Sequence, residues 1–552
     1  MELPVAHWLP RYRRAWLAHD AIAGITVWAL IVPEAMAYAA IAGVPVQFGL
    51  YAVPLSLLGY VVFGSSRQLF VGPSATVASI SAVAVGSVAV AGAAPSQFVA
   101  LTSALALMVG ALYVLLGIAR MGFVARFFAK PVLDGFIIGL GLFIGVGQIP
   151  KLVGIHKPSG DTIRVLVETL WQIGSWQWWT VGTGVVALAT LFGLARYAPK
   201  VPGALVVVAA SLVLVPLLGL ADHGVAIVGP VPTGFHFVSW SGIGWHDLVH
   251  LLPGALAIVV VGFAQSVAIA KAYAAKYHYP VDANQELIGY GAANLGAGAL
   301  QGYTVTGSLS KSAAAEEAGG KSPVLLLVAG AGVLLTVVAL AGLFANLPEA
   351  VLAAVVIHAV SGMVDFSKLT VLRRARLPDF WPALGALLGV VVIGILPGVL
   401  IGVALSFGLL IHALDHPHVA ILGRDGTGRR FRERDRNAGF EDVPDTVIHR
   451  FEAPLIFANA DIFTDSVHAS VAAADAPPRT LILDFAAVAD VDTTGSQALR
   501  TLRSEYDGGT ALLLARVPGT VRDALRADGT LAAIGEERVF PTIRDAVAST
   551  ER

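Results

Sequence analysis

Two stretches of this sequence, "GSSRQLFVGPSATVAS" (residues 64–79) and "GALQGYTVTGSLSKSAAAEEAGG" (residues 298–320), interrupt apolar runs that are long enough to span a membrane. In both, a short extended run leads into glycine and serine, and a helix of small residues follows. Extended backbone at membrane depth is tolerated only where it lines a cavity or is buried in protein. The two stretches therefore predict two helices that begin inside the membrane.

The composition places the chain in a membrane. Of its 552 residues, 56% are hydrophobic and 13% are charged, and the mean hydropathy is +0.75, which excludes an ordinary soluble domain. From about Ala21 to His412 the apolar runs predict roughly fourteen helical segments. The sequence has no cysteine and no Walker-type glycine loop, and no constellation of metal ligands stands out. We therefore expect no thiol chemistry, nucleotide-driven pump, metal, cofactor or nucleic acid.

The two interrupted stretches occupy matching places in the chain. Residues 307–310 take the place of residues 72–75, and the extended runs before them are residues 68–71 and 303–306. Secondary transporters are commonly built from inverted repeats, and their substrate lies between discontinuous helices. The matching stretches therefore indicate an internal repeat.

The helices before the two stretches, at residues 20–42 and 251–273, also correspond. A seven-helix unit that is repeated in one chain must be inverted, because the second copy starts on the other side of the membrane. We expect a transmembrane domain over residues 20–415, with repeats at about 20–220 and 248–415.

The expected site lies where the two broken helices start. Such a start presents unpaired N–H groups and the positive end of the helix dipole, so two starts that face each other make an anion site. Pro73 fits the first helical turn, where its missing N–H costs nothing. The alternative is that small residues here only allow close helix packing. The expected site segments are Pro73, Ser74, Ala75 and Thr76 in the first half and Ser308, Leu309, Ser310 and Lys311 in the second.

Polar side chains at membrane depth are costly, and they mark functional sites by default. Glu34 lies in the first helix with Tyr38 on the same face, Gln265 lies at the corresponding depth of the second repeat, and Lys311 can supply a fixed positive charge. Because a buried carboxyl takes up a proton readily, we expect Glu34 to carry a proton with the anion. Alternatively, Glu34 and Lys311 extend toward water, and Gln265 bridges two helices.

After the apolar region the composition changes abruptly. Residues 416–444 are rich in Arg and Asp and are expected to form a linker, and residues 445–552 alternate strand-like and helix-like segments. This pattern predicts a separate domain with β/α layers. Its turn at residues 492–495 offers backbone N–H groups to a phosphate or to a partner, or simply caps a helix.

The charged loops indicate the orientation. Residues 1–19 lack the pattern of a removable signal peptide and carry a basic flank. Positive residues are enriched in cytoplasmic loops, and here they recur in every second loop of the expected topology. We therefore expect an integral protein of the cytoplasmic or plasma membrane with both termini in the cytoplasm.

Several long motifs resemble one family. They are "VPEAMAYAAIAGVPVQFGLYA", "GSSRQLFVGPSATVA", "VDANQELIGYGAANLGAGALQGY", "TGSLSKSAAAEEAGGKSPV" and, in the tail, "LILDFAAVADVDTTG". Together they are similar to the SulP anion transporters, the sulfate-permease family that also contains prestin, with a tail that looks like a STAS domain. The resemblance covers nearly the whole chain. It implies fourteen helices in two inverted repeats of seven, a core and a gate domain, and homodimers.

The resemblance also implies that Glu34, Tyr38, Gln265 and the two site segments surround the substrate. Many relatives have a carboxylate in place of Gln265, which leaves Glu34 as the acid for coupling, and many have arginine in place of Lys311. The ammonium of a lysine is a point charge, whereas the guanidinium of an arginine can bind an oxyanion through two hydrogen bonds. The oxyanion specificity of relatives with arginine is therefore not expected to apply to this chain. In STAS-like regulators the hydroxyl before the turn glycine is phosphorylated, which corresponds to Thr494 here.

The sequence thus predicts a proton-coupled secondary transporter of small anions rather than an enzyme. Sulfate, bicarbonate and dicarboxylates all fit such a site. The alternatives are an anion exchanger or channel of the same fold, a nucleobase permease, and a membrane sensor that signals through its tail. The expected partners are a small anion, a proton, the lipid bilayer, a second copy of the chain and a cytoplasmic regulatory protein.

Overall fold

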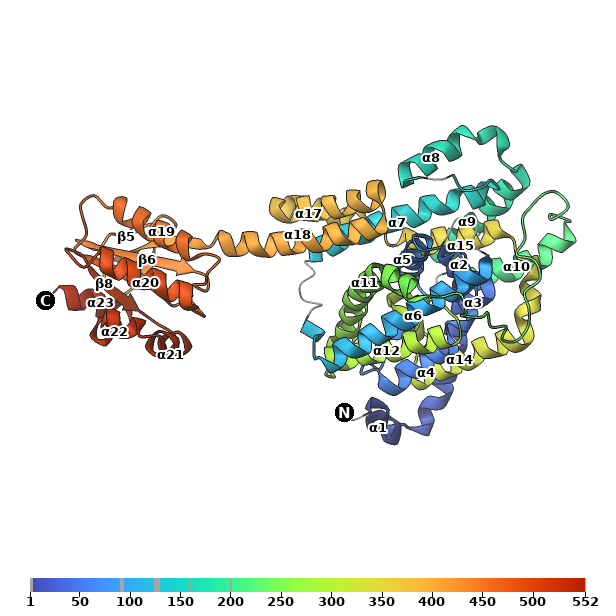
Figure 1. Ribbon diagram of the computed structural model, residues 1–552, viewed down its shortest axis with the longest axis horizontal. Coiled ribbons are helices and arrows are strands. Elements are labelled where there is room, and N and C mark those ends of the chain that lie inside the picture. The colour runs from blue at the N-terminus through green and yellow to red at the C-terminus, as the bar shows by residue number, and fades with distance from the viewer. Residues whose placement is uncertain (1–2, 90–93, 124–129, 159, 199–200, 552) are drawn as a thin grey trace. The chain divides into compact units, whose positions relative to one another are not determined.

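The computed structural model describes the whole chain except residues 1–2, 90–93, 124–129, 159, 199–200 and 552, and the side chains at positions 396, 399, 410 and 413. The chain forms two compact units, Met1–Ser406 and Phe407–Arg552 (Figure 1). Each unit is described by itself below.

The first unit is helical. Within the described residues, eight helices are long and apolar enough to cross a membrane, and four shorter apolar helices accompany them. The first seven segments are α2 (Leu17–Ala42), α3 (Val46–Tyr51) with α4 (Pro54–Phe63), α5 (Ala75–Gly86), α6 (Pro95–Ile118), α7 (Lys130–Val153), α9 (Trp178–Tyr197) and α10 (Gly203–Leu217). The second seven are α11 (Trp245–Tyr277), α12 (Ala283–Ala299), α13 (Leu309–Glu317), α14 (Val324–Leu335), α15 (Glu349–Ser361), α17 (Leu377–Leu388) and α18 (Ile395–Asp415), whose residues after Ser406 are counted with the second unit. Short helices α1 (Pro4–Trp8), α8 (Thr162–Trp171) and α16 (Phe366–Ala375) lie outside these sets.

The helices of the two sets interleave. Helix α12 packs between α6 and α4 (Figure 1). Helix α2 packs against α14, α13 and α5. In a second group, α7 packs against α17 and α15, and α15 packs against α9. Small residues allow the close approach: a Cβ added to Gly110 would lie 2.7 Å from the backbone nitrogen of Leu295, so α6 and α12 touch through their backbones. The half-helices α5 and α13 belong to the first group.

The two interrupted stretches meet in a short antiparallel ladder. Strand β1 (Phe70–Gly72) pairs with β2 (Thr306–Ser308), with Phe70 opposite Ser308 and Gly72 opposite Thr306. All six residues are buried. The pairing satisfies backbone groups that have no water partner at this depth. The strands therefore lie one to three residues later than the expected extended runs, residues 68–71 and 303–306.

The second unit is a mixed sheet with helices on both faces. Its strands are β3 (His418–Asp425), β4 (Phe431–Glu433), β5 (Phe440–Glu441), β6 (Thr446–Glu452), β7 (Thr480–Asp484), β8 (Ala511–Ala515) and β9 (Val539–Phe540). Its helices are α19 (Ala460–Ala472), α20 (Thr493–Glu505), α21 (Gly519–Ala527), α22 (Thr530–Ile534) and α23 (Ile543–Thr550). The strand order is β4-β3-β6-β7-β8-β9, and β6 to β9 run parallel. Alternating residues of these strands pack under α19 to α22 on one face and under α23 on the other.

The expected linker at residues 416–444 is wrong. Strand β3 pairs antiparallel with β6 along four residues, from His418 opposite Glu452 to Ile421 opposite His449. Strands β4 and β5 both pair with β3. Because Ala420 and Leu422 are buried in the sheet's hydrophobic core, this charged segment is part of the domain.

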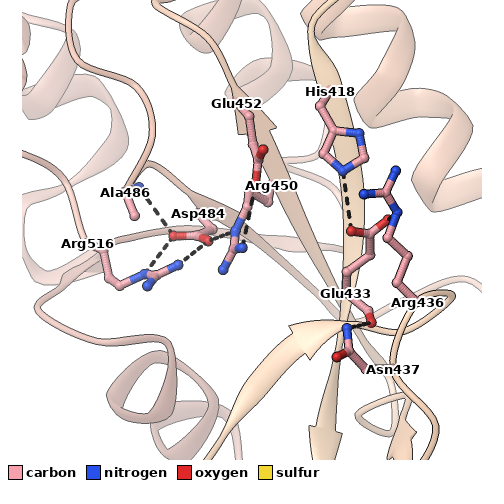
Figure 2. A network of polar contacts seen from close by, with 9 residues as sticks. All are labelled: His418, Glu433, Arg436, Asn437, Arg450, Glu452, Asp484, Ala486 and Arg516. Carbon is pink, nitrogen blue, oxygen red and sulfur yellow. Dashed lines mark hydrogen bonds and ion pairs between the residues drawn. The ribbon is translucent and has the colours of Figure 1, made fainter. Parts of the chain in front are cut away.

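A buried carboxylate joins the ends of three parallel strands (Figure 2). Asp484 at the end of β7 has a side chain with no exposed surface, and it accepts hydrogen bonds from Nε of Arg450 at 2.7 Å and from Nε of Arg516 at 2.8 Å. These arginines lie on β6 and directly after β8. Parallel strands bring their carboxyl ends to one edge, so the network ties β6, β7 and β8 together there. Two guanidinium groups therefore share this one buried carboxylate, so it keeps a charged partner if either arginine is removed.

His449 provides a pH-sensitive element in the same sheet. It lies on β6 with 1% of its surface exposed, and its Nδ1 and Nε2 lie 2.9 and 3.3 Å from the hydroxyls of Ser470 and Ser466 on α19. Burial lowers the pKa of His449 to about 4. The folded unit therefore holds this ring neutral at pH values where the unfolded chain protonates it.

We expect the second unit to lose stability as the pH falls from 6.5 toward 4. The unfolded state binds the extra proton there, so at pH 5 the free energy of unfolding should be about 2 kcal/mol lower than at pH 7. Pulse proteolysis of the full-length chain in urea measures this change. His449→Gln keeps a hydrogen-bonding side chain that does not titrate, and it should flatten the pH dependence; an unchanged pH dependence in that variant would contradict the assignment.

Candidate functional site

The two half-helices begin at capping serines on either side of the β1–β2 ladder. Helix α5 begins at Ala75 with Ser74 as its N-cap, and α13 begins at Leu309 with Ser308 as its N-cap. Pro73 therefore precedes the cap and does not lie in the first helical turn, contrary to the sequence-based expectation. The expected alignment of residues 307–310 with residues 72–75 is also one residue out, because the caps Ser74 and Ser308 are the equivalent positions.

The caps differ in their hydrogen bonds. The Oγ of Ser308 accepts from the backbone nitrogen of Lys311 at 3.5 Å and lies 3.2 Å from the hydroxyl of Ser310. The Oγ of Ser74 is buried, and it has no hydrogen-bond partner within the part of the chain that the structure describes. A buried hydroxyl without a partner costs free energy. Ser74 is thus a donor available to a ligand at the start of α5.

An ion pair connects the first helix to the second half-helix. The Nζ of Lys311 contacts Oε2 of Glu34, and the two side chains are 2% and 14% exposed. The same ammonium donates to the carbonyl oxygen of Pro73 at 3.4 Å. Lys311 therefore links α13, α2 and the segment that leads into α5.

Tyr38 completes this cluster. Its hydroxyl donates to Oε2 of Glu34 at 3.3 Å, and the ammonium of Lys311 lies 5.4 Å from the centre of its ring. A cation over an aromatic face is attracted by the ring quadrupole. Lys311 is thus held by a carboxylate, a carbonyl and a ring, and the expected fixed positive charge is balanced by Glu34.

The remaining expected residues lie around the cluster. Ala75 and Thr76 are each 6% exposed in the first turn of α5. Leu309 is 58% exposed and Ser310 is also exposed, so the first turn of α13 is accessible. Gln265 is half-buried on α11, and among the described residues no hydrogen bond involves its side chain.

Three buried polar residues that the sequence-based reasoning missed hold the ladder in place. The Oγ of Ser266, the neighbour of Gln265, accepts from the backbone nitrogen of Gly307 at 2.8 Å. Ser312 accepts from the backbone nitrogen of Phe70 at 2.8 Å. Asn294 accepts from the backbone nitrogen of Val305 at 2.9 Å and donates to its carbonyl at 3.0 Å. The signal in the sequence that could have identified them is a polar residue within an otherwise apolar helix.

Two further missed carboxylates clamp the loops around the site. Glu286 on α12, with no exposed surface, accepts from the hydroxyl of Tyr60 at 2.9 Å and the backbone nitrogen of Ser65 at 2.7 Å. Asp20 on α2, also fully buried, accepts from the backbone nitrogen of Lys321 at 2.6 Å and the hydroxyl of Ser322 at 2.6 Å. Buried carboxylates with several donors are structural anchors. Glu34 differs from them because its partner is a side-chain cation.

In the second unit, the turn at residues 492–495 is a helix cap. Asp492 accepts from the backbone nitrogens of Gly495 at 2.8 Å and Phe457 at 2.7 Å. Thr494 is exposed in the first turn of α20, so its hydroxyl is accessible. Within the described ranges no group of three or more His, Cys, Asp or Glu side chains is placed to hold a metal ion.

Comparisons with known proteins agree with this architecture. Residues 17–385 match the model of the sulfate permease family, and residues 438–546 match that of the STAS domain. A probable sulfate transporter of Mycobacterium tuberculosis is 34% identical over 99% of both chains. The chloroplastic sulfate transporter 4.1 of Arabidopsis thaliana is 31% identical over 99% of this chain and 82% of its own length.

Solved structures share the fold. The anion transporter Slc26a9 of mouse, in its inward-facing state, superposes with a TM-score of 0.90 at 24% identity, covering 100% of this chain and 94% of that one. The transmembrane domain of the cyanobacterial bicarbonate transporter BicA matches with a TM-score of 0.62 at 18% identity over 72% of this chain and 99% of that chain. The expected fold class, a polytopic helical membrane domain with an α/β tail, is confirmed. The chain belongs to the sulfate permease family, and it is an integral membrane transporter with a STAS domain rather than an enzyme.

Proposed function

We propose that this protein is a secondary transporter that carries a small anion together with a proton, and that the anion binds between the starts of α5 and α13. The observation that carries this proposal is the Glu34–Lys311 ion pair beside both helix starts. Backbone N–H groups and the helix dipoles favour an anion at such starts. The hydroxyl of Ser74 supports the same reading, because it lacks a partner among the described residues.

The charges of the pair explain how a proton and an anion become coupled. With both side chains ionised the pair has no net charge, and the ammonium of Lys311 is engaged by Glu34. A proton on Glu34 removes its negative charge and leaves Lys311 free to bind an anion. Each ligand then favours the other, and this coupling must be reciprocal. A monovalent anion leaves the loaded site electrically balanced, as the empty site is, whereas a dianion such as sulfate gives it one net negative charge.

Sulfate is the first candidate substrate. Relatives aligned over nearly the whole chain are named sulfate transporters. The donors at the site are an ammonium, hydroxyls and backbone N–H groups. These groups can bind bicarbonate or a dicarboxylate as well as sulfate. Lys311 provides a point charge, which sets no planar geometry on the ligand.

The proposed movement separates the two groups of helices. Helices α2, α5, α11 and α13 form the core that carries the site, and α7, α9, α15 and α17 belong to the gate. Rocking of one group against the other would expose the site alternately to either side. Both termini in the cytoplasm, a homodimer, and regulation through the STAS domain, including modification of Thr494, belong to this proposal.

The ion pair predicts a specific pattern of stability. Lys311→Met leaves Glu34 without its cation in a buried site, which should cost about 3 kcal/mol. The double variant Glu34→Gln/Lys311→Met removes both charges, so it should be more stable than Lys311→Met alone. Thermal unfolding of the purified full-length protein in detergent measures this order. Additive losses in the double variant would show that the two side chains do not interact.

Uptake of labelled sulfate and bicarbonate into proteoliposomes tests the coupling. With an inward proton gradient, the natural chain should accumulate the anion above equilibrium. Glu34→Gln cannot exchange a proton, so the gradient should no longer drive its uptake. The matched control is Glu317→Gln, which removes an exposed carboxylate at the far end of the same half-helix and should behave as the natural chain does.

The remaining outcomes separate the alternatives. Uptake that ignores the gradient in all variants but needs an anion on the opposite side would indicate an exchanger. Currents far above the turnover of a carrier, without accumulation, would indicate a channel. Binding without flux would indicate a sensor, and each of these results would overturn proton-coupled symport.

A further inference from the structure

A polar cavity lies between the two groups of helices, apart from the central cluster. It encloses about 430 Å³ and is lined by the end of α2, the start of α3, the end of α7, residues 228–231 and the start of α15. Its volume falls in the range of small-molecule sites. The residues that line it include Ala40, Gln47, Gln148, Lys151 and Glu349, and none of the residues of the central cluster.

The cavity lies at the membrane face opposite the one where α2 begins. Helix α2 starts at Leu17 and ends at Ala42, and the cavity is lined by its last turns, from Ala37 onward. Ala37 is three residues after Glu34, which is about 4.5 Å along the helix. The cavity is therefore separate from the central site, but it approaches that site along α2.

Two polar groups in the cavity point to a ligand. Gln148 on α7 is 9% exposed, lines the cavity, and makes no side-chain hydrogen bond to any residue that the structure describes. Its amide atoms keep some exposed surface, so a molecule in the cavity can bind them. Beside it, the Nζ of Lys151 lies 3.4 Å from Oε2 of Glu349, and these side chains are 36% and 43% exposed. A half-exposed ion pair of this kind is weak and can be opened by a competing anion.

A second lysine, which does not itself line the cavity, adds positive charge near Lys151. The ammonium of Lys157 lies 3.4 Å from where a Cβ on Gly147 would be, next to Gln148, and 5.9 Å from the ring centre of Phe143. Partial burial, and then the charge of Lys151, lower the pKa of Lys157. Glu349 balances only one of the two ammonium groups, so the group of three carries one net positive charge when all are ionised. A cleft with one sign of charge concentrates ligands of the opposite sign.

The positive residues of this face lie in one stretch of the chain, with Lys151 and Lys157 at its start and Arg164 farther along. The other connections expected on the same face, at residues 43–46, 87–94, 218–244 and 341–348, contain no lysine or arginine. Lysine and arginine are in general depleted on the face opposite the cytoplasm. Lys151 and Lys157 are exceptions to that pattern, and they lie at and beside the cavity.

We propose that this cavity is a second anion site, in which the ammonium of Lys151 and the amide of Gln148 hold a small inorganic oxyanion on its way to or from the central site. Glu349 competes with the anion for Lys151. An arriving anion displaces the carboxylate from the ammonium, and the carboxylate returns when the anion moves on. That the ligand is a transported anion rests on the proposed function; the binding itself does not require transport.

Because the natural chain has no cysteine, a single introduced thiol can report occupancy. Ala40 lines the cavity and is half-buried, so Ala40→Cys places the thiol there. The measured quantity is the rate at which a charged methanethiosulfonate reagent modifies the purified full-length protein in detergent. Sodium sulfate and sodium bicarbonate are the probes, with gluconate to keep the ionic strength constant.

We expect sulfate to slow the modification of Ala40→Cys. The half-protecting concentration is the sulfate concentration that halves the modification rate. Adding Lys151→Gln should raise it about tenfold, because one hydrogen bond to a charged group usually contributes that much to affinity. Adding Glu349→Gln should lower it, because Lys151 is then free. The matched control is Arg164→Gln, which removes a positive charge from the same face at an exposed α8 residue that does not line the cavity, and which should leave the protection unchanged.

A final variant separates this site from the central one. In Ala40→Cys/Lys311→Met, protection by sulfate should persist, even if transport is lost. If sulfate instead protects the thiol only through the central site, Lys311→Met would abolish protection and Lys151→Gln would leave the half-protecting concentration unchanged. That result would overturn the proposal. No protection by either anion, or equal effects of Lys151→Gln and Arg164→Gln, would also overturn it. Failure of the uptake experiment with intact protection would refute the proposed transport and leave this site standing.

Discussion

The need to satisfy backbone groups at membrane depth underlies the whole transmembrane unit. A chain that leaves the helical conformation there must find partners for its N–H and C=O groups within the protein. The structure meets this need by pairing β1 with β2, one strand from each half of the chain. Because the ladder is antiparallel, α5 and α13 leave it at opposite ends. The ladder thus fixes both half-helix starts with a single element.

Buried polar side chains extend this solution from the ladder to the helices around it. Ser266 and Asn294 hold β2 and the residue before it, and Ser312 holds β1. Each donates or accepts where an apolar side chain would leave a backbone group unpaired. Glu286 and Asp20 act in the same way on the adjoining loops. The Glu34–Lys311 pair at the half-helix starts differs from these anchors, because it joins two charged side chains.

Several local predictions failed for one physical reason, which is that a segment's ends depend on partners elsewhere. Pro73 was placed in the first turn of a helix, but Ser74 is the cap, because β1 continues through Gly72 to pair with Thr306. Residues 416–444 look like a linker by charge and composition, yet β3 lies beside β6 in the sheet. The hydrogen bonds between strands are made by the backbone, so the side-chain sequence of a strand says little about which strand lies beside it.

The sequence by itself determined the membrane character, the two matching broken helices, the candidate side chains and the family resemblance, because hydropathy, glycine placement and local motifs are properties of neighbouring residues. Only the tertiary structure decided that Lys311 pairs with Glu34, that Glu286 and Asp20 are anchors, and that Gln148 lines a cavity with Lys151. These contacts join residues far apart in the chain. They exist only after the helices pack, since packing sets which buried charge meets which partner.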